Sequence, residues 1–182
     1  MKKQAWLILC LIALVAGLAL AVTNMITEGP IEEQRVKAIL AARTAVFPQA
    51  SSFEDVMISA NSVLDSIVIA KSGEDTLGYV LQNTVSGYAG PIQIILGVDT
   101  QGVITGLTVG GSKFSETAGL GTQVKDPTFT DQFVGLAEMP TLKGNVDTIS
   151  GATVSSSAVI NGVIQCYTQW KALAVTAPAN SN

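Results

Sequence analysis

The stretch DTISGATVSSSAVING, residues 147–162, gathers small hydroxyl residues around a glycine just before an expected helix. A serine or threonine in such a position commonly accepts hydrogen bonds from the free backbone N–H groups of the first helical turn. The same N–H groups, with the partial positive charge of a helix N-terminus, also form a site for a phosphate without any lysine or arginine. Gly151 lets another group approach the backbone, and Thr153 supplies a hydroxyl that can form a phosphoester. From residue types alone, a helix cap and a phosphate site are both open interpretations.

The chain contains no histidine, which removes the commonest general base, metal ligand and haem ligand. Ser-His-Asp hydrolases are therefore excluded. With only Cys10 and Cys166, no cysteine-rich zinc site or iron–sulfur site is expected, and we predict no bound metal. A threonine hydroxyl is a weak nucleophile without a base, so a bond to Thr153 would require a separate enzyme. Any redox chemistry must be carried by an organic cofactor.

The first part of the chain predicts a membrane-spanning helix. Two lysines precede the uncharged stretch from Gln4 to Thr27, and glutamates follow it between residues 28 and 33. A span needs about 20 apolar residues, and this charge distribution favours a cytoplasmic N-terminus and an exported C-terminal part. A cleaved signal peptide is the alternative, because Ala19-Leu20-Ala21 matches a cleavage site. The apolar stretch is longer than the usual signal-peptide core of about 7–15 residues, which favours a retained anchor.

The predicted exported part is acidic. Removing Lys2, Lys3 and Glu28 from the chain's 10 basic and 14 acidic residues leaves 8 and 13, a net charge of −5. Nucleic acid demands a positive face, so we expect no nucleic-acid partner. Cys10 lies in the expected span and cannot pair with Cys166, so the exported part is predicted to fold without an internal disulfide.

The hydrophobic pattern predicts an α+β fold with an antiparallel sheet and packed helices. Pro30 to Phe47 predicts a helix that continues from the anchor with a bend at Gly29-Pro30. Apolar side chains at three- and four-residue steps from Val154 predict a long C-terminal helix. A short helix is expected within Pro127–Leu136. Short runs separated by polar turns predict the strands 66–71, 77–85, 92–98 and 103–109.

Three motifs resemble those of one known family, the FMN-binding domains. The stretch Asp147–Ser156 resembles the family's flavinylation motif, in which the last threonine of S/T-G-A-T is esterified to the FMN phosphate. Gly87–Ile92, GYAGPI, resembles its G-Y-x-G-P segment, within which we expect Tyr88 to pack on the sheet. Ser115–Gly121, SETAGLG, resembles its E-T-P-G-L-G loop near the flavin, with Ala118 where the family usually has proline.

The resemblance implies a covalent FMN and the residues that surround it. Glu116 and Thr117 also have a simpler interpretation as a polar loop. The cofactor-binding residues that the resemblance implies are Thr153 (the attachment point), Ser150, Gly151, Ala152, Glu116, Thr117, Gly119 and Leu120.

The order of an N-terminal span and these motifs is similar to the G subunits of Rnf electron-transport complexes, which are related to the C subunits of sodium-translocating NADH:quinone reductases. This resemblance implies an electron-carrier subunit of a membrane-bound, ion-translocating complex of the ferredoxin/NAD type. It implies flavin-containing and iron–sulfur partner subunits and a flavin transferase for maturation. The span from Gln4 to Thr27 has no charged residue, so ion movement is expected in partner subunits. Two alternatives stay open, a membrane-anchored FMN-binding sensor or assembly module without turnover, and an exported flavin reductase.

We therefore expect a single-pass protein of the cell (inner) membrane that contacts the lipid bilayer, with its FMN domain on the extracytoplasmic side. Residues 1–28 are predicted to form the cytoplasmic N-terminus and transmembrane anchor, and residues 29–50 a juxtamembrane helix. Residues 51–175 are predicted to form the FMN-binding domain, followed by a flexible tail at 176–182.

Overall fold

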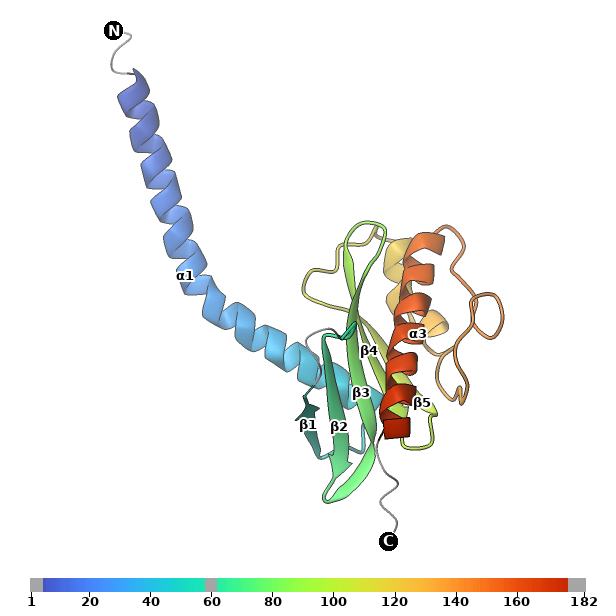
Figure 1. Ribbon diagram of the computed structural model, residues 1–182. Coiled ribbons are helices and arrows are strands. Elements are labelled where there is room, and N and C mark those ends of the chain that lie inside the picture. Colours follow the sequence, from blue (N-terminus) through green and yellow to red (C-terminus); the bar gives the residue numbers. More distant parts are fainter. Residues whose placement is uncertain (1–4, 58–61, 177–182) are drawn as a thin grey trace. The chain divides into compact units, whose positions relative to one another are not determined.

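The computed structural model describes residues 5–57 and 62–176 (Figure 1). The chain divides into two compact units, and the boundary between them lies between Leu40 and Ala41. The predicted flexible tail, 176–182, lies outside the described residues except for its first position.

A single helix, α1 (Ala5–Val46), covers the described part of the predicted membrane span and the predicted following helix up to Val46. Its segment Trp6–Val46 includes an 18-residue window with a mean hydropathy of 2.7, and none of that window is buried within the protein. By length and composition this helix can cross a membrane. Pro30, at the predicted bend, removes one N–H donor from the helical ladder without ending α1.

Five strands form one antiparallel sheet in the order β1-β2-β3-β4-β5, so every strand pairs with its neighbour in the sequence. The strands are β1 (Ser52–Val56), β2 (Ser66–Ser72), β3 (Asp75–Ser86), β4 (Pro91–Asp99) and β5 (Ile104–Gly110). The predicted antiparallel sheet is confirmed, and four of its strands agree with the predicted runs. The fifth, β1, is an edge strand whose side chains are mostly exposed, which explains why it shows no hydrophobic pattern.

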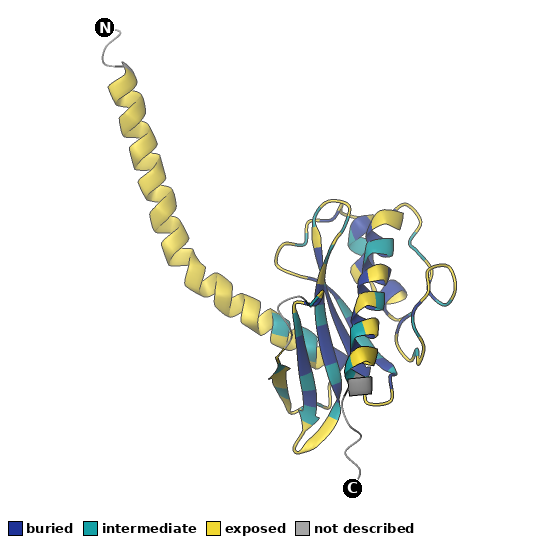
Figure 2. Cartoon of the chain, viewed as in Figure 1, coloured by how far each residue is buried: buried dark blue, intermediate teal, exposed yellow. Residues whose placement is uncertain are grey.

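Strand β4 is buried on both faces because a different element covers each face (Figure 2). Successive side chains of a strand point to opposite faces. Ile94 and Leu96 belong to the main core beneath the C-terminal helix, whereas Ile95 packs with Val46 and Phe47 at the end of α1. The continuous apolar run of β4 therefore belongs to two cores at once.

The C-terminal helix, α3 (Thr153–Thr176), packs along β3 and β4 (Figure 1). Gly162 permits a close approach to the sheet, because a Cβ atom there would overlap the side chain of Ile94. Further along, the Tyr167 hydroxyl donates a hydrogen bond to the carbonyl of Gly102 at 2.9 Å. The position of α3 is thus fixed by contacts along its buried face.

Two short helices connect β5 to α3. They are η1 (Gly121–Lys125), a 3₁₀ helix, and α2 (Pro127–Thr130), which covers only the first part of the predicted helix. Phe129 and Phe133 are both buried, and their rings meet edge to face with centroids 5.6 Å apart. The segment therefore contributes to the main core although most of it is not helical.

We expect Leu96→Ala to destabilise the folded domain. The Leu96 side chain is fully buried in β4, and truncation of such a leucine lowers the free energy of unfolding by about 2–5 kcal/mol. Urea unfolding of the detergent-solubilised chain, followed by far-UV circular dichroism, measures the change. Leu142→Ala removes the same atoms from a side chain that is 42% exposed, so its effect is expected to be much smaller.

A second prediction concerns alkaline pH. Burial, and secondarily the negative charge of Asp65, raise the pKa of the Cys166 thiol from 9.0 to about 12. As the pH rises above 9, the unfolded chain loses this proton while the folded chain keeps it, so stability falls until about pH 12. Below pH 9 both states keep the proton and this group has no effect on the pH dependence.

Urea midpoints measured across this alkaline range are therefore expected to fall more steeply for the wild-type chain than for Cys166→Ala. Equal slopes for the two proteins would contradict the raised pKa of the buried thiol.

Candidate functional site

Thr153 is the first residue of α3, and its side chain is exposed. The backbone N–H of Ser156 donates to the carbonyl of Ala152 at 2.9 Å, which begins the helical hydrogen bonding. The N–H groups before this bond belong to the first turn, where a helix offers donors without helical acceptors. An exposed hydroxyl and free donors therefore lie together at the positive end of the helix dipole.

The turn that precedes Thr153 is held by its own residues. Gly151 has a φ angle of +80°, which L side chains rarely adopt, and the N–H of Ala152 donates to the carbonyl of Ile149 at 3.0 Å. The hydroxyl of Ser156 donates to the carbonyl of Ala152 at 2.9 Å and accepts from the N–H of Ile149 at 3.2 Å. Ser156 rather than Ser150 thus ties this turn to the helix.

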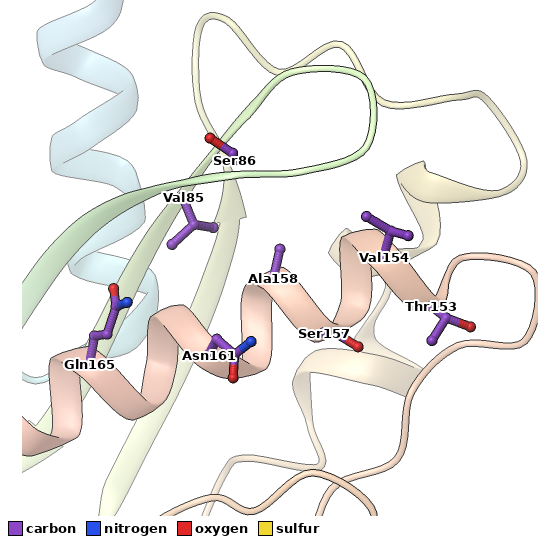
Figure 3. A pocket seen from close by; sticks show the side chains of 8 residues that line it. All are labelled: Val85, Ser86, Thr153, Val154, Ser157, Ala158, Asn161 and Gln165. Atoms are coloured by element: carbon purple, nitrogen blue, oxygen red, sulfur yellow. The ribbon is translucent and has the colours of Figure 1, made fainter.

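An open groove of about 490 Å³ begins at Thr153 and follows α3 past the last residues of β3 (Figure 3). Thr153 stands at one end of the groove and Gln165 at the other, with Val85 pointing toward the helix. All of the lining side chains are uncharged, and they mix hydroxyl, amide and aliphatic groups. They are Val85 and Ser86 of β3 and Thr153, Val154, Ser157, Ala158, Asn161 and Gln165 of α3.

The carboxylate of Glu116 joins the three motifs that were identified in the sequence. Glu116 is only 7% exposed. The hydroxyl of Ser155, in the first turn of α3, donates to its Oε2 at 2.6 Å. The backbone N–H of Ala89, in the GYAGP motif, donates to its Oε1 at 3.0 Å. The structure therefore brings Glu116 next to the predicted attachment site, with its oxygens directed into the protein.

The other predicted residues of the SETAGLG motif lie at the surface. The N–H of Leu120 donates to the carbonyl of Thr117 at 3.2 Å, and the N–H of Gly119 donates to the hydroxyl of Thr122 at 3.0 Å. Leu120 is 47% exposed, and its Cδ2 lies 3.3 Å from the position of a Cβ atom built on Gly151. This exposed turn thus borders the glycine that precedes Thr153.

Tyr88, which was expected to pack on the sheet, is 73% exposed, because the GYAGP motif forms the tip of the β3–β4 hairpin. That expectation was wrong.

Within the described part of the chain, no three or more His, Cys, Asp or Glu side chains gather where they could hold a metal ion.

Comparison with known proteins identifies the family. Residues 87–168, which contain all three motifs, match the FMN-binding domain family. The G subunit of the Na(+)-translocating ferredoxin:NAD(+) oxidoreductase complex of Acetobacterium woodii is 37% identical over 187 residues, covering 88% of this chain and 89% of that protein. The chain belongs to the family of G subunits of ion-translocating oxidoreductase complexes.

A second G subunit, from the ion-translocating oxidoreductase complex of Methanosarcina acetivorans, is 35% identical, and the match covers 84% of this chain and 85% of that protein. The family resemblance drawn from the three motifs is thus confirmed. Among solved structures, the C subunit of the Na(+)-translocating NADH-quinone reductase from Parabacteroides distasonis superposes with a TM-score of 0.48 at 20% identity. That superposition covers 64% of each chain, slightly less than two thirds.

The groove of this G-subunit chain contains residues that the sequence analysis did not identify. Thr153, Ser157, Asn161 and Gln165 follow one another at four-residue steps, so they share one face of α3. This polar stripe begins at the predicted attachment residue and is visible in the sequence. The sequence alone does not mark it as part of a groove, because a polar helix face ordinarily contacts solvent.

We expect Gly151→Ala to lower the free energy of unfolding by about 1–2 kcal/mol, since an L side chain at this positive φ is strained. The added Cβ would also press on Leu120. Urea unfolding measures the effect. Gly29→Ala is the control, because its added methyl group lies in a helix and meets nothing within 4 Å, and its midpoint should not fall.

Proposed function

We propose that this chain is an electron carrier in a membrane-bound, ion-translocating complex of the ferredoxin/NAD type, with FMN attached through a phosphoester to Thr153. The observation that carries the proposal is the position of Thr153. Its exposed hydroxyl lies at the N-terminus of α3 and at the end of an uncharged groove, within the segment that matches the FMN-binding domain family.

The residues present fit an FMN group. The phosphate suits the helix N-terminus, where backbone donors and the helix dipole favour an anion, and Gly151 places no side chain beside it. The groove, at about 490 Å³, lies within the usual range for ligand sites of about 300–1,000 Å³. Its aliphatic side chains suit the flat faces of a flavin ring, and the amides of Asn161 and Gln165 suit its polar edge.

The remaining predicted residues have positions consistent with this proposal. Ser150 and Ala152 lie in the turn that precedes the attachment point, and Thr117, Gly119 and Leu120 form the exposed turn beside Gly151. We propose that these residues border the phosphate end of the cofactor. Glu116 lies beneath them, with its carboxylate turned inward.

Attachment requires an activated phosphate, which we assign to a flavin dinucleotide bound by a separate transferase. The Thr153 hydroxyl loses its proton and attacks the phosphorus on the FMN side of the pyrophosphate. A new phosphoester bond forms, the pyrophosphate bond breaks, and a nucleoside monophosphate leaves with the bonding electrons. The chain has no histidine, and the Glu116 carboxylate is buried and already accepts bonds from Ser155 and Ala89, so we assign acceptance of the proton to the transferase.

Bound FMN supplies the electron chemistry, and the protein positions it. A covalent link keeps the flavin at high local concentration where a dissociated cofactor would be lost. No residue of the groove is an acid or a base, which disfavours the alternative of an exported flavin reductase that protonates its own substrate.

We further propose that α1 anchors the chain in the membrane as a single span, with a cytoplasmic N-terminus and the FMN domain on the extracytoplasmic side. Residues 1–28 would contain the anchor, 29–50 the juxtamembrane part, and 51–175 the FMN-binding domain. The span has no charged side chain between Gln4 and Thr27, so ion movement is assigned to partner subunits. Those partners supply the flavin and iron–sulfur centres with which this protein exchanges electrons.

The intact mass of the chain tests the attachment. Co-expression with a flavin transferase is expected to add the mass of one FMN less one water, and Thr153→Ala is expected to abolish the addition. Thr153→Ser retains an alcohol and should keep part of it. Thr128→Ala removes an exposed hydroxyl from α2 and serves as the matched control, with full addition expected. An unmodified wild-type chain in the transferase-expressing cell would refute the proposal.

Measurements on the purified complex distinguish an electron carrier from a sensor or assembly module. If this protein carries electrons, a complex containing Thr153→Ala assembles with all of its subunits but loses ferredoxin-dependent reduction of NAD. Retention of that activity by the assembled complex would instead identify an assembly role.

A further inference from the structure

Glu116 lies where three separate segments of the chain meet. The segments are the tip of the β3–β4 hairpin at residues 87–90, the loop at residues 115–121, and the first turn of α3. We propose that Glu116 is a positioning residue whose carboxylate clamps these segments together and so presents Thr153 for flavin attachment. This inference rests on the function proposed above.

Both oxygens of the Glu116 carboxylate are engaged by protein donors. Oε2 accepts from the Ser155 hydroxyl at 2.6 Å and Oε1 from the Ala89 N–H at 3.0 Å. A second bond joins the same two loops, from the hydroxyl of Ser115 to the carbonyl of Ala89 at 3.1 Å. Hydrogen bonds to a charged group are stronger than neutral ones, so Glu116 supplies the strongest of these links.

The surrounding backbone leaves room for this carboxylate. A Cβ atom on Gly87 would overlap Oε1, and a Cβ atom on Gly121 would overlap Oε2. The Cβ of Gly121 would also lie 3.2 Å from the hydroxyl of Ser155. Two segments thus have glycine at the positions where any larger residue would displace the Glu116 side chain.

The charge of Glu116 indicates that this side chain does more than fill space in the core. Among the described residues, no lysine or arginine forms an ion pair with it, although it is only 7% exposed. A buried carboxylate is destabilising unless its partners compensate it, and an apolar residue would fill the same space at less cost. What an apolar residue could not do is hold Ser155 and Ala89 at fixed distances.

The clamp acts on Thr153 through the helix. Ser155 lies two residues after Thr153 in the first turn of α3, so a displacement of Ser155 moves the free N–H groups and the Thr153 hydroxyl with it. The loop that contains Glu116, residues 111–120, consists of turns and irregular backbone. A loop of this kind relies on such specific bonds for its position.

The test combines two measurements on the full-length chain in detergent. One is the single-turnover rate at which a purified transferase attaches flavin from a flavin dinucleotide, read by intact mass. The other is hydrogen exchange of the Ala89 amide and of the first turn of α3, compared with the amides of β4. The variants are Glu116→Ala, Ser155→Ala and the double variant, with Glu74→Ala in the exposed β2–β3 turn as the control.

Ser155→Ala removes one charge-assisted hydrogen bond and is expected to slow attachment about tenfold and to speed local exchange by a similar factor. Glu116→Ala removes the bonds to both Ser155 and Ala89, so its effects are expected to be at least as large. The double variant should be no slower than Glu116→Ala, because Ser155 acts through its bond to Glu116, which that variant already lacks. Exchange in β4 and the rates for Glu74→Ala should match the wild type.

Two further variants separate positioning from general destabilisation. Gly121→Ala leaves the carboxylate chemically intact but fills its space, so it should reproduce the slow attachment of Glu116→Ala. Glu116→Gln keeps the shape and two polar atoms, and it should recover part of the rate. Gly29→Ala, whose methyl group meets nothing within 4 Å, should attach flavin normally.

Attachment at the wild-type rate in folded Glu116→Ala, with unchanged exchange at Ala89, would overturn the clamp. So would additive effects of Glu116→Ala and Ser155→Ala. If Glu116→Ala does not fold, Ser155→Ala alone decides, because it removes a single oxygen atom. A wild-type chain that never acquires flavin would remove the proposed function, while the exchange measurements would still decide whether the clamp exists.

Discussion

The packing of α3 against β3 and β4 is the interaction on which the candidate site depends. The middle of the helix touches the sheet at Gly162, and Tyr167 bonds to the loop after β4 near its other end. A helix hydrogen-bonded throughout moves as one body, so these buried contacts fix the direction of its exposed first turn. The position of Thr153 is thus determined by residues two to four turns away as well as by its immediate neighbours.

Three consecutive serines near the start of α3 have three different roles. Successive residues of a helix point about 100° apart, so neighbouring side chains meet different surroundings. Ser155 reaches across to Glu116, Ser156 bonds back to the turn that precedes the helix, and Ser157 lines the groove. The unusual run of hydroxyl residues is therefore explained by three separate contacts rather than by repeated capping.

Local pattern was sufficient for the sheet and for α3, because alternation and three- to four-residue spacing are properties of neighbouring residues. It was insufficient for β1, whose exposed edge position gives no apolar signal. It was also insufficient for Glu116, which was expected near the flavin but is bonded to partners 27 and 39 residues away in the sequence. The groove combines β3 with α3, and no short-range pattern reports which strand lies beside a helix.

The strand order has a consequence for biogenesis. Every strand of the sheet pairs with the one before it, so the sheet can form in the order in which the polypeptide is delivered, without waiting for distant segments. The helix α3 then packs on strands β3 and β4, which were completed earlier. Thr153, the proposed attachment residue, therefore reaches its final surroundings late in folding, which favours the finished domain, rather than the nascent chain, as the substrate of the proposed transferase.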